Sequence, residues 1–243
     1  MIILAFDGTA KAASVAVLDG ERVLASYTVD NGLTQSELLL PMAEDMLGAL
    51  HLTFRDVGLF AVAEGPGSFT GVRIGAALVK GLAFGRDIPC VGVSTLEALA
   101  ENISPLEGIL LPCMDARRGQ VYSATFASDG CEVRRVTEDR AIAIKDLAEE
   151  LLREGDKKIY LSGDGYEVAR RGLMAAGVKV QVTPSMLINE SAASVGLVAL
   201  RKYERGEAVS DKDIAPTYLR MPQAERERLE RLAQAGAEEM TKK

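Results

Sequence analysis

The sequence predicts an α/β protein of two lobes, each a mixed sheet with flanking helices. Short apolar runs typical of buried strands alternate with stretches of helical period. The runs IILAFD then SVAVL, and ILLPCMD then VYSATF, both indicate a strand, an aspartate, a turn and a returning strand. A chain of 243 residues that is 48% apolar can form one large domain or two small ones. We therefore expect a duplicated domain, with chance recurrence of aspartate-initiated hairpins as the alternative.

The N-terminal lobe, residues 1–104, begins with an antiparallel meander whose first bend holds Asp7. The helix that follows carries more apolar surface than packing on one sheet requires, which indicates that part of it meets a partner. A nearly all-apolar helix comes next, and a capping box at Ser94 and Glu97 opens a third. Strands are expected at 1–6, 14–18, 22–29, 59–63 and 90–93, and the first two helices at 36–50 and 69–83.

The segment GPGSFTGVRIG, residues 65–75, predicts a tight loop that leads into a helix capped by Ser68. Its glycines suit positive φ angles and the close approach of another backbone. A phosphate cradle is the alternative, because glycine-rich loops before helices bind anions. The segment lacks the G-x-x-x-x-G-K-[ST] and G-x-G-x-x-G patterns, so the structural interpretation is favoured. The loop residues are Gly65, Gly67, Ser68, Gly71 and Gly75.

Pro105 marks the start of the C-terminal lobe, residues 105–220, in which Asp115 follows its strand as Asp7 does in the first lobe. Whether the last helix packs back on the N-terminal lobe stays open. Strands are expected at 108–114, 120–126, 158–161 and 178–182, and helices at 145–154, 167–176 and 191–203. Residues 221–243 hold five acidic and five basic residues, which favours a solvated charged helix or a frayed tail.

Composition argues against several classes of function. The net charge is −7, with 6 basic against 12 acidic residues in 1–104, which disfavours nucleic-acid binding by the chain alone. His51 is the only histidine, so paired-histidine metal sites and histidine relays cannot be built without it. Cys90, Cys113 and Cys131 lack metal or redox spacing, which fits reduced thiols. We expect a cytoplasmic protein with no metal site, no signal peptide and no membrane span.

The two aspartate turns and a later strand-Gly-Asp-Gly-helix turn resemble the phosphate and adenosine loops of the actin, sugar-kinase and Hsp70 (ASKHA) superfamily. In an active member such carboxylates hold Mg²⁺ and water against the terminal phosphate. Here Thr9 is the only hydroxyl in the first loop, among alanines. The residues of this degenerate nucleotide site are Asp7, Thr9, Asp115 and Gly163.

Four motifs occur in the order seen in the TsaB (YeaZ) family, which the chain resembles from its first strand to Arg220. They are SELLLP at 36–41, GPGSFTGVRIG at 65–75, MDARRGQVY at 114–122 and APTYLR at 215–220. The resemblance implies the ASKHA fold and a role in making N6-threonylcarbamoyladenosine beside the anticodon of tRNAs that read codons beginning with A. Gln35 departs from the family, in which histidine is common there.

The resemblance also implies that the chain is not itself a catalyst and holds no cofactor. Family members dimerise with the catalytic paralogue TsaD, or with themselves when alone, and recruit the ATPase TsaE. They meet tRNA, and any nucleotide, through that complex. An ATP-binding kinase or ATPase using Asp7 and Asp115 is the alternative. A peptidase is less favoured, because no metal pair or nucleophile–base arrangement supports it.

In the family the first two helices form the partner surface, and these are the two helices with excess apolar surface here. The expected contacts are Ser36, Glu37, Leu39, Met42, Met46, Arg73, Ile74 and Leu78. The alternative is that these side chains belong to the intramolecular core, because the sequence does not fix the rotation of a helix.

Overall fold

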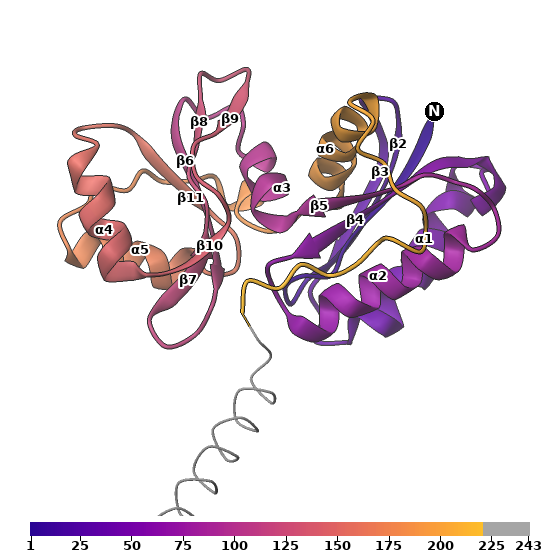
Figure 1. The fold of residues 1–243 in the computed structure, drawn as a ribbon, viewed down its shortest axis with the longest axis horizontal. Coiled ribbons are helices and arrows are strands. Elements are labelled where there is room, and N and C mark those ends of the chain that lie inside the picture. The colour runs from indigo at the N-terminus through magenta and orange to yellow at the C-terminus, as the bar shows by residue number, and fades with distance from the viewer. Residues whose placement is uncertain (221–243) are drawn as a thin grey trace, which may run out of the picture.

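The computed structural model describes residues 1–220, which form two lobes side by side (Figure 1). Each lobe is a mixed sheet with helices against its faces, so the predicted two-lobed α/β architecture is confirmed. Within the described part of the chain, no helix is both long and apolar enough to cross a membrane. The charged tail expected at 221–243 lies outside the described residues.

The N-terminal sheet has the strand order β3-β2-β1-β4-β5. The first three strands form the predicted antiparallel meander, and β4 and β5 extend the sheet in parallel. β1 and β4 are nearly all buried because helices cover both faces, which explains their unbroken apolar runs. The strands are β1 Ile2–Asp7, β2 Ala13–Asp19, β3 Arg22–Val29, β4 Val57–Gly65 and β5 Cys90–Ser94.

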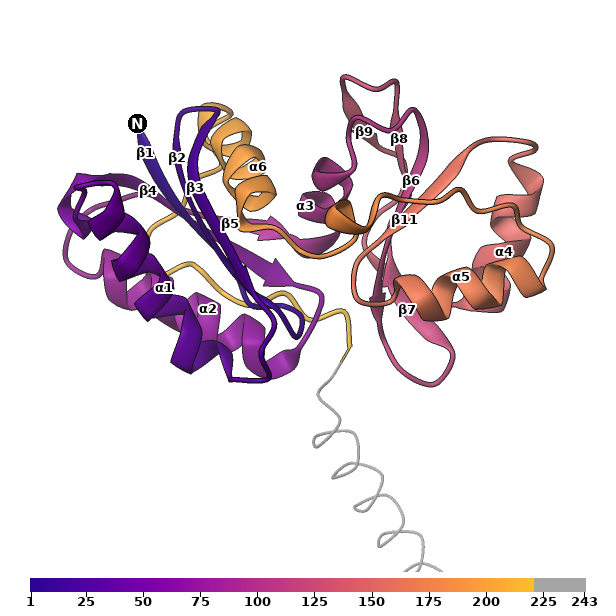
Figure 2. The same ribbon diagram turned by 180° about the vertical axis from the view of Figure 1, so that it is seen from behind.

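Three helices cover the two faces of this sheet: α1 (Gln35–Ala49), α2 (Phe69–Ala83) and α6 (Ala192–Glu204). α1 and α2 pack on one face and α6 packs on the other, as Figures 1 and 2 show from opposite sides. The last helix therefore does pack back on the N-terminal lobe. α1 begins at a capping box, in which the Thr34 backbone N–H donates to the Glu37 carboxylate at 2.9 Å.

The C-terminal lobe repeats this order of elements. β6, β7 and β10 correspond to β1, β2 and β3, and α4, β11 and α5 then follow as α1, β4 and α2 do. β8 and β9 are additional strands, of which β8 pairs with β6 and β9 pairs with β8. The repeat agrees with the expected duplication. The bounds are β6 Gly108–Asp115, β7 Gln120–Ser123, β8 Phe126–Ser128, β9 Val133–Arg135, β10 Arg140–Ala143, α4 Ile144–Arg153, β11 Ile159–Ser162 and α5 Tyr166–Ala175.

Within residues 1–220, the remaining elements are one α-helix and two short 3₁₀ helices, and the α-helix bridges the lobes. α3 (Thr95–Asn102) follows β5 directly, and its apolar side chains pack with those of β6 and β8. Two short 3₁₀ helices, η1 (Phe54–Asp56) and η2 (Ser185–Leu187), lie in the connections that precede β4 and α6. The core of the protein is thus divided between the two sheets, and α3 bridges them.

Two predicted strands differ from the structure. The strand expected at 120–126 is broken into β7 and β8, because β7 pairs with the end of β6 and β8 pairs with its start. The strand expected at 178–182 does not form, although valines alternate along it. Val182 is 77% exposed, and the hydrogen bond from the Gln181 N–H to the Ile159 carbonyl (2.8 Å) is not continued into a ladder with β11.

Candidate functional site

The loops after β1 and β6, which the sequence singled out, meet at a cleft of about 560 Å³ between the lobes. The first loop contributes Ala10 and Lys11, and the second contributes Asp115 and Arg117. The start of α1, the glycine-rich loop before α2 and residues 217–220 complete the walls. The fold therefore brings three of the four family-like motifs to one place.

Asp7 lies beneath the first loop and is 1% exposed. One carboxylate oxygen accepts hydrogen bonds from both the backbone N–H (2.9 Å) and the hydroxyl (2.7 Å) of Thr9. The other oxygen is buried without a hydrogen-bond partner among the described residues. Burial raises the pKa of Asp7 to about 6. The only hydroxyl of the first loop is thus used within the loop, and Thr9 is itself fully buried.

A second buried acid, Glu190, lies near Asp7 and was not anticipated from the sequence. Its carboxylate accepts a hydrogen bond from the Asp164 N–H at 3.2 Å, and its side chain is 3% exposed. Burial, with the nearby negative charge of Asp7 adding to it, raises the pKa of Glu190 to about 8. No sequence pattern marks Glu190, which precedes α6 in an ordinary loop.

Asp115 and Asp164 link the turns of the C-terminal lobe. Asp164 accepts a hydrogen bond from the Asp115 N–H, and Asp115 accepts one from the Arg117 N–H, both at 2.8 Å. Gly163 has a φ of 93°, and a Cβ there would lie 2.4 Å from the Cys113 carbonyl oxygen. Among residues 1–220, no group of three or more His, Cys, Asp or Glu side chains is arranged to hold a metal ion.

The glycines of the loop before α2 allow close contact with other backbone segments. A Cβ at Gly71 would lie 1.8 Å from the Gly8 carbonyl oxygen, and one at Gly67 would lie 2.4 Å from the Thr9 carbonyl oxygen. Gly65 has a φ of 112°, and Gly75 packs on β4. Ser68 caps α2, since its hydroxyl accepts from the Gly71 N–H, and its own N–H donates to the Thr9 carbonyl at 2.6 Å. The loop before α2 therefore holds the first aspartate loop in place.

Gln35 also supports the first loop. Its side-chain Nε2 donates to the carbonyls of Ala10 (2.7 Å) and Lys11 (3.3 Å). Because a side-chain amide does not titrate, these hydrogen bonds between the start of α1 and the first loop do not depend on pH.

The residues expected on the partner surface divide into two groups. Leu39, Met42 and Met46 are buried against their own sheet, which corrects their expected place on the outer surface of α1. Their spacing of three and four residues forms the stripe that packs on a sheet. The other five are at least partly accessible: Ser36, Glu37 and Arg73 are exposed, and Ile74 and Leu78 are half-buried on α2.

Comparisons with known proteins agree with the resemblance. A family model described as "TsaD: tRNA N6-adenosine threonylcarbamoyltransferase" matches residues 34–228. A Bacillus subtilis relative, "tRNA threonylcarbamoyladenosine biosynthesis protein TsaB", is 31% identical over 93% of this chain and 96% of its own. The Escherichia coli protein of that name is 29% identical over 90% of this chain and 95% of its own. The structure "YeaZ from Pseudomonas aeruginosa" aligns with a TM-score of 0.73 and 27% identity, covering 90% of this chain and all of that one.

Proposed function

The chain belongs to the TsaB (YeaZ) family of tRNA threonylcarbamoyladenosine biosynthesis proteins, and from this premise we propose that it is the non-catalytic subunit of a tRNA threonylcarbamoyltransferase. In this proposal it activates a TsaD-like paralogue by dimerising with it, and the pair recruits a TsaE-like ATPase. The protein works in the cytoplasm and meets tRNA through the complex. Alone, it forms a homodimer.

The proposed non-catalytic role is supported mainly by the burial and hydrogen bonding of Asp7 at the first loop. Asp7 is buried, one of its carboxylate oxygens accepts both hydrogen bonds from Thr9, and the other oxygen is buried within the described part of the chain and does not line the cleft. A carboxylate that holds Mg²⁺ against a phosphate must reach the ligand in its charged form. Asp7 instead stabilises its own loop. This favours a loop that keeps the shape of a nucleotide site but has only a structural role.

The partner surface is proposed to be the outer face of α2 with the adjoining part of α1. Ile74 and Leu78 are half-buried there, and Ala77 between them is exposed. A helix face made of small and apolar residues lets a second helix approach closely. Leu39, Met42 and Met46 lie beneath this face and support it from the core.

The proposal is tested by titrating the TsaD-like paralogue of the same organism with the wild type and with Ala77→Arg. Ala77 is exposed, so its substitution leaves the core intact, yet a charged side chain placed in an interface should weaken binding roughly a hundredfold. Ala175→Arg is the matched control, because Ala175 is an exposed alanine on α5 in the other lobe. Unchanged binding by Ala77→Arg, or equal loss in the control, would contradict the proposed surface.

A further inference from the structure

After α6 the chain returns across the N-terminal lobe, as the yellow segment in Figure 1 shows, and residues 217–220 line the cleft. It pairs with the edge strand β5 through two hydrogen bonds between Cys90 and Val209. Lys80 of α2 donates to the Lys212 carbonyl at 3.0 Å. The Thr217 N–H then donates to the Glu64 carbonyl of β4 at 2.7 Å. We call residues 217–220 the strap.

One side chain of the strap fixes Arg73 on α2. The Tyr218 hydroxyl accepts a hydrogen bond from Arg73 Nε at 2.7 Å. The Arg73 guanidinium also lies 3.8 Å from the centre of the Phe69 ring, and the Phe69 and Tyr218 rings are 4.9 Å apart. Both rings stabilise the cation and restrict its rotamers. The exposed Arg73 is left with its two Nη groups, a fork that suits a carboxylate on a partner.

Two residues later, the strap contacts the C-terminal lobe. Arg220 donates to the Ala116 carbonyl (3.5 Å) in the turn between β6 and β7, and to the side chain of Gln120, the first residue of β7. Its guanidinium lies 5.7 Å from the centre of the Tyr122 ring. The strap therefore joins the Asp115 turn of one lobe to Arg73 of the other across the mouth of the cleft.

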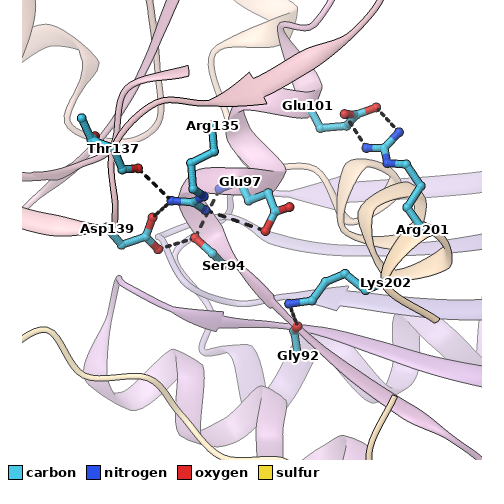
Figure 3. A network of polar contacts seen from close by, with 9 residues as sticks. All are labelled: Gly92, Ser94, Glu97, Glu101, Arg135, Thr137, Asp139, Arg201 and Lys202. Carbon is cyan, nitrogen blue, oxygen red and sulfur yellow. Dashed lines mark hydrogen bonds and ion pairs between the residues drawn. The ribbon is translucent and has the colours of Figure 1, made fainter. Parts of the chain in front are cut away.

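The lobes are also joined by a separate polar network at the start of α3, shown in Figure 3. The Ser94 hydroxyl at the end of β5 donates to Asp139, which accepts from Arg135 as well, each at 2.5 Å. Arg135 reaches Glu97 at 3.8 Å. Because this network does not involve the strap, releasing the strap should shift the C-terminal lobe at the cleft mouth without separating the lobes.

We propose that Tyr218 and Arg220 are positioning residues, through which the strap transmits the position of the C-terminal lobe to Arg73. The consequence for binding rests on the proposed function: with Arg73 held, its fork meets a carboxylate of the TsaD-like paralogue. Motion of the β6–β7 turn would pull Arg220, shift Tyr218 and release Arg73. The state of the cleft would then control affinity at α2.

The direct test is the ¹⁵N signal of Arg73 Nε, assigned by its loss in Arg73→Lys. Arg220→Gln does not touch Arg73, yet it should shift this signal and speed exchange of its hydrogen towards the Tyr218→Phe values. Arg153→Gln on α4 and Tyr203→Phe on α6 are matched exposed controls and should leave it unchanged. The proposal would be overturned if Tyr218→Phe changed the Arg73 signal and Arg220→Gln left it unchanged.

Affinity for the paralogue then separates this inference from the proposed function. Arg220→Gln should weaken binding about fivefold, the size of one hydrogen bond. The double variant Arg73→Gln, Arg220→Gln should bind no worse than Arg73→Gln alone, because both act through one contact. Unchanged affinity in Arg220→Gln alongside weakened Ala77→Arg would refute the strap's role while leaving the interface in place. Unchanged affinity in Ala77→Arg would refute the interface itself, and the Arg73 signal would still decide the coupling.

Discussion

Replacing Gly71 with alanine is expected to destabilise the protein strongly, although the same change at Gly81 in the same helix should be favourable. A Cβ at Gly71 would lie 1.8 Å from the Gly8 carbonyl oxygen and 3.0 Å from its carbon. Ordinary contacts of a Cβ begin at 3.4 Å, so the helix or the first aspartate loop must move by more than an ångström. Both contacts are with backbone, which cannot rotate away. We expect a loss of about 3 kcal/mol in the free energy of unfolding, the upper end for overpacking.

Gly81 gives the matched control, because it lies in the same helix with no heavy atom within 4 Å of an added Cβ. Alanine there should raise the free energy of unfolding by about 0.5–1 kcal/mol through helix propensity alone. Urea unfolding followed by circular dichroism measures both changes. A Gly71→Ala protein as stable as the wild type, or equal effects of the two substitutions, would refute the close packing of α2 on the first loop.

Three further predictions concern a buried acid, the cap of α3 and the support of the first loop. Burial raises the pKa of Glu190 from 4.5 to about 8, so the folded wild type should lose stability as pH rises through that window. Glu190→Gln should remove this loss in the free energy of unfolding, which is on the order of a few kcal/mol above pH ~8. Urea unfolding at a series of pH values measures it. Ser94→Ala removes the cap of α3 and the hydrogen bond to Asp139, and should lower the free energy of unfolding by about 1–2 kcal/mol; a thermal midpoint equal to the wild type would contradict it. Gln35→Ala frees the Ala10 carbonyl and should cost about 1 kcal/mol with faster hydrogen exchange in that loop, whereas unaltered exchange would argue against the support.

Much of the fold could be predicted because the two sheets are covered on both faces. Strands such as β1 and β4 then appear as unbroken apolar runs, and the aspartates that end β1 and β6 stand out against them. The glycine-rich segment predicts a loop before a helix, and in the structure Ser68 caps that helix. Local signals of this kind do not depend on distant contacts.

The rest depended on contacts that the sequence does not encode locally. The apolar excess of α1 did not reveal its rotation, so core residues such as Met46 were expected at a surface. The valines of 178–182 alternate as in a strand, but no ladder forms beside β11. Glu190 reaches Asp7 only because α6 packs back on the N-terminal lobe. Tyr218 belongs to the APTYLR motif, but nothing in the motif indicates that Arg73, 145 residues earlier, donates to its hydroxyl.

We propose that this chain activates threonylcarbamoyl transfer without performing it. The most direct measurement is modification of tRNA by the TsaC-, TsaD- and TsaE-like proteins of the same organism, with and without this chain. We expect transfer only when the chain is present; it should be retained with Ala175→Arg and lost with Ala77→Arg. Asp7→Asn, if it folds, should keep its activity, because Asp7 supports a loop. Equal transfer without the chain, or loss of transfer by a folded Asp7→Asn protein that still binds the paralogue, would contradict it.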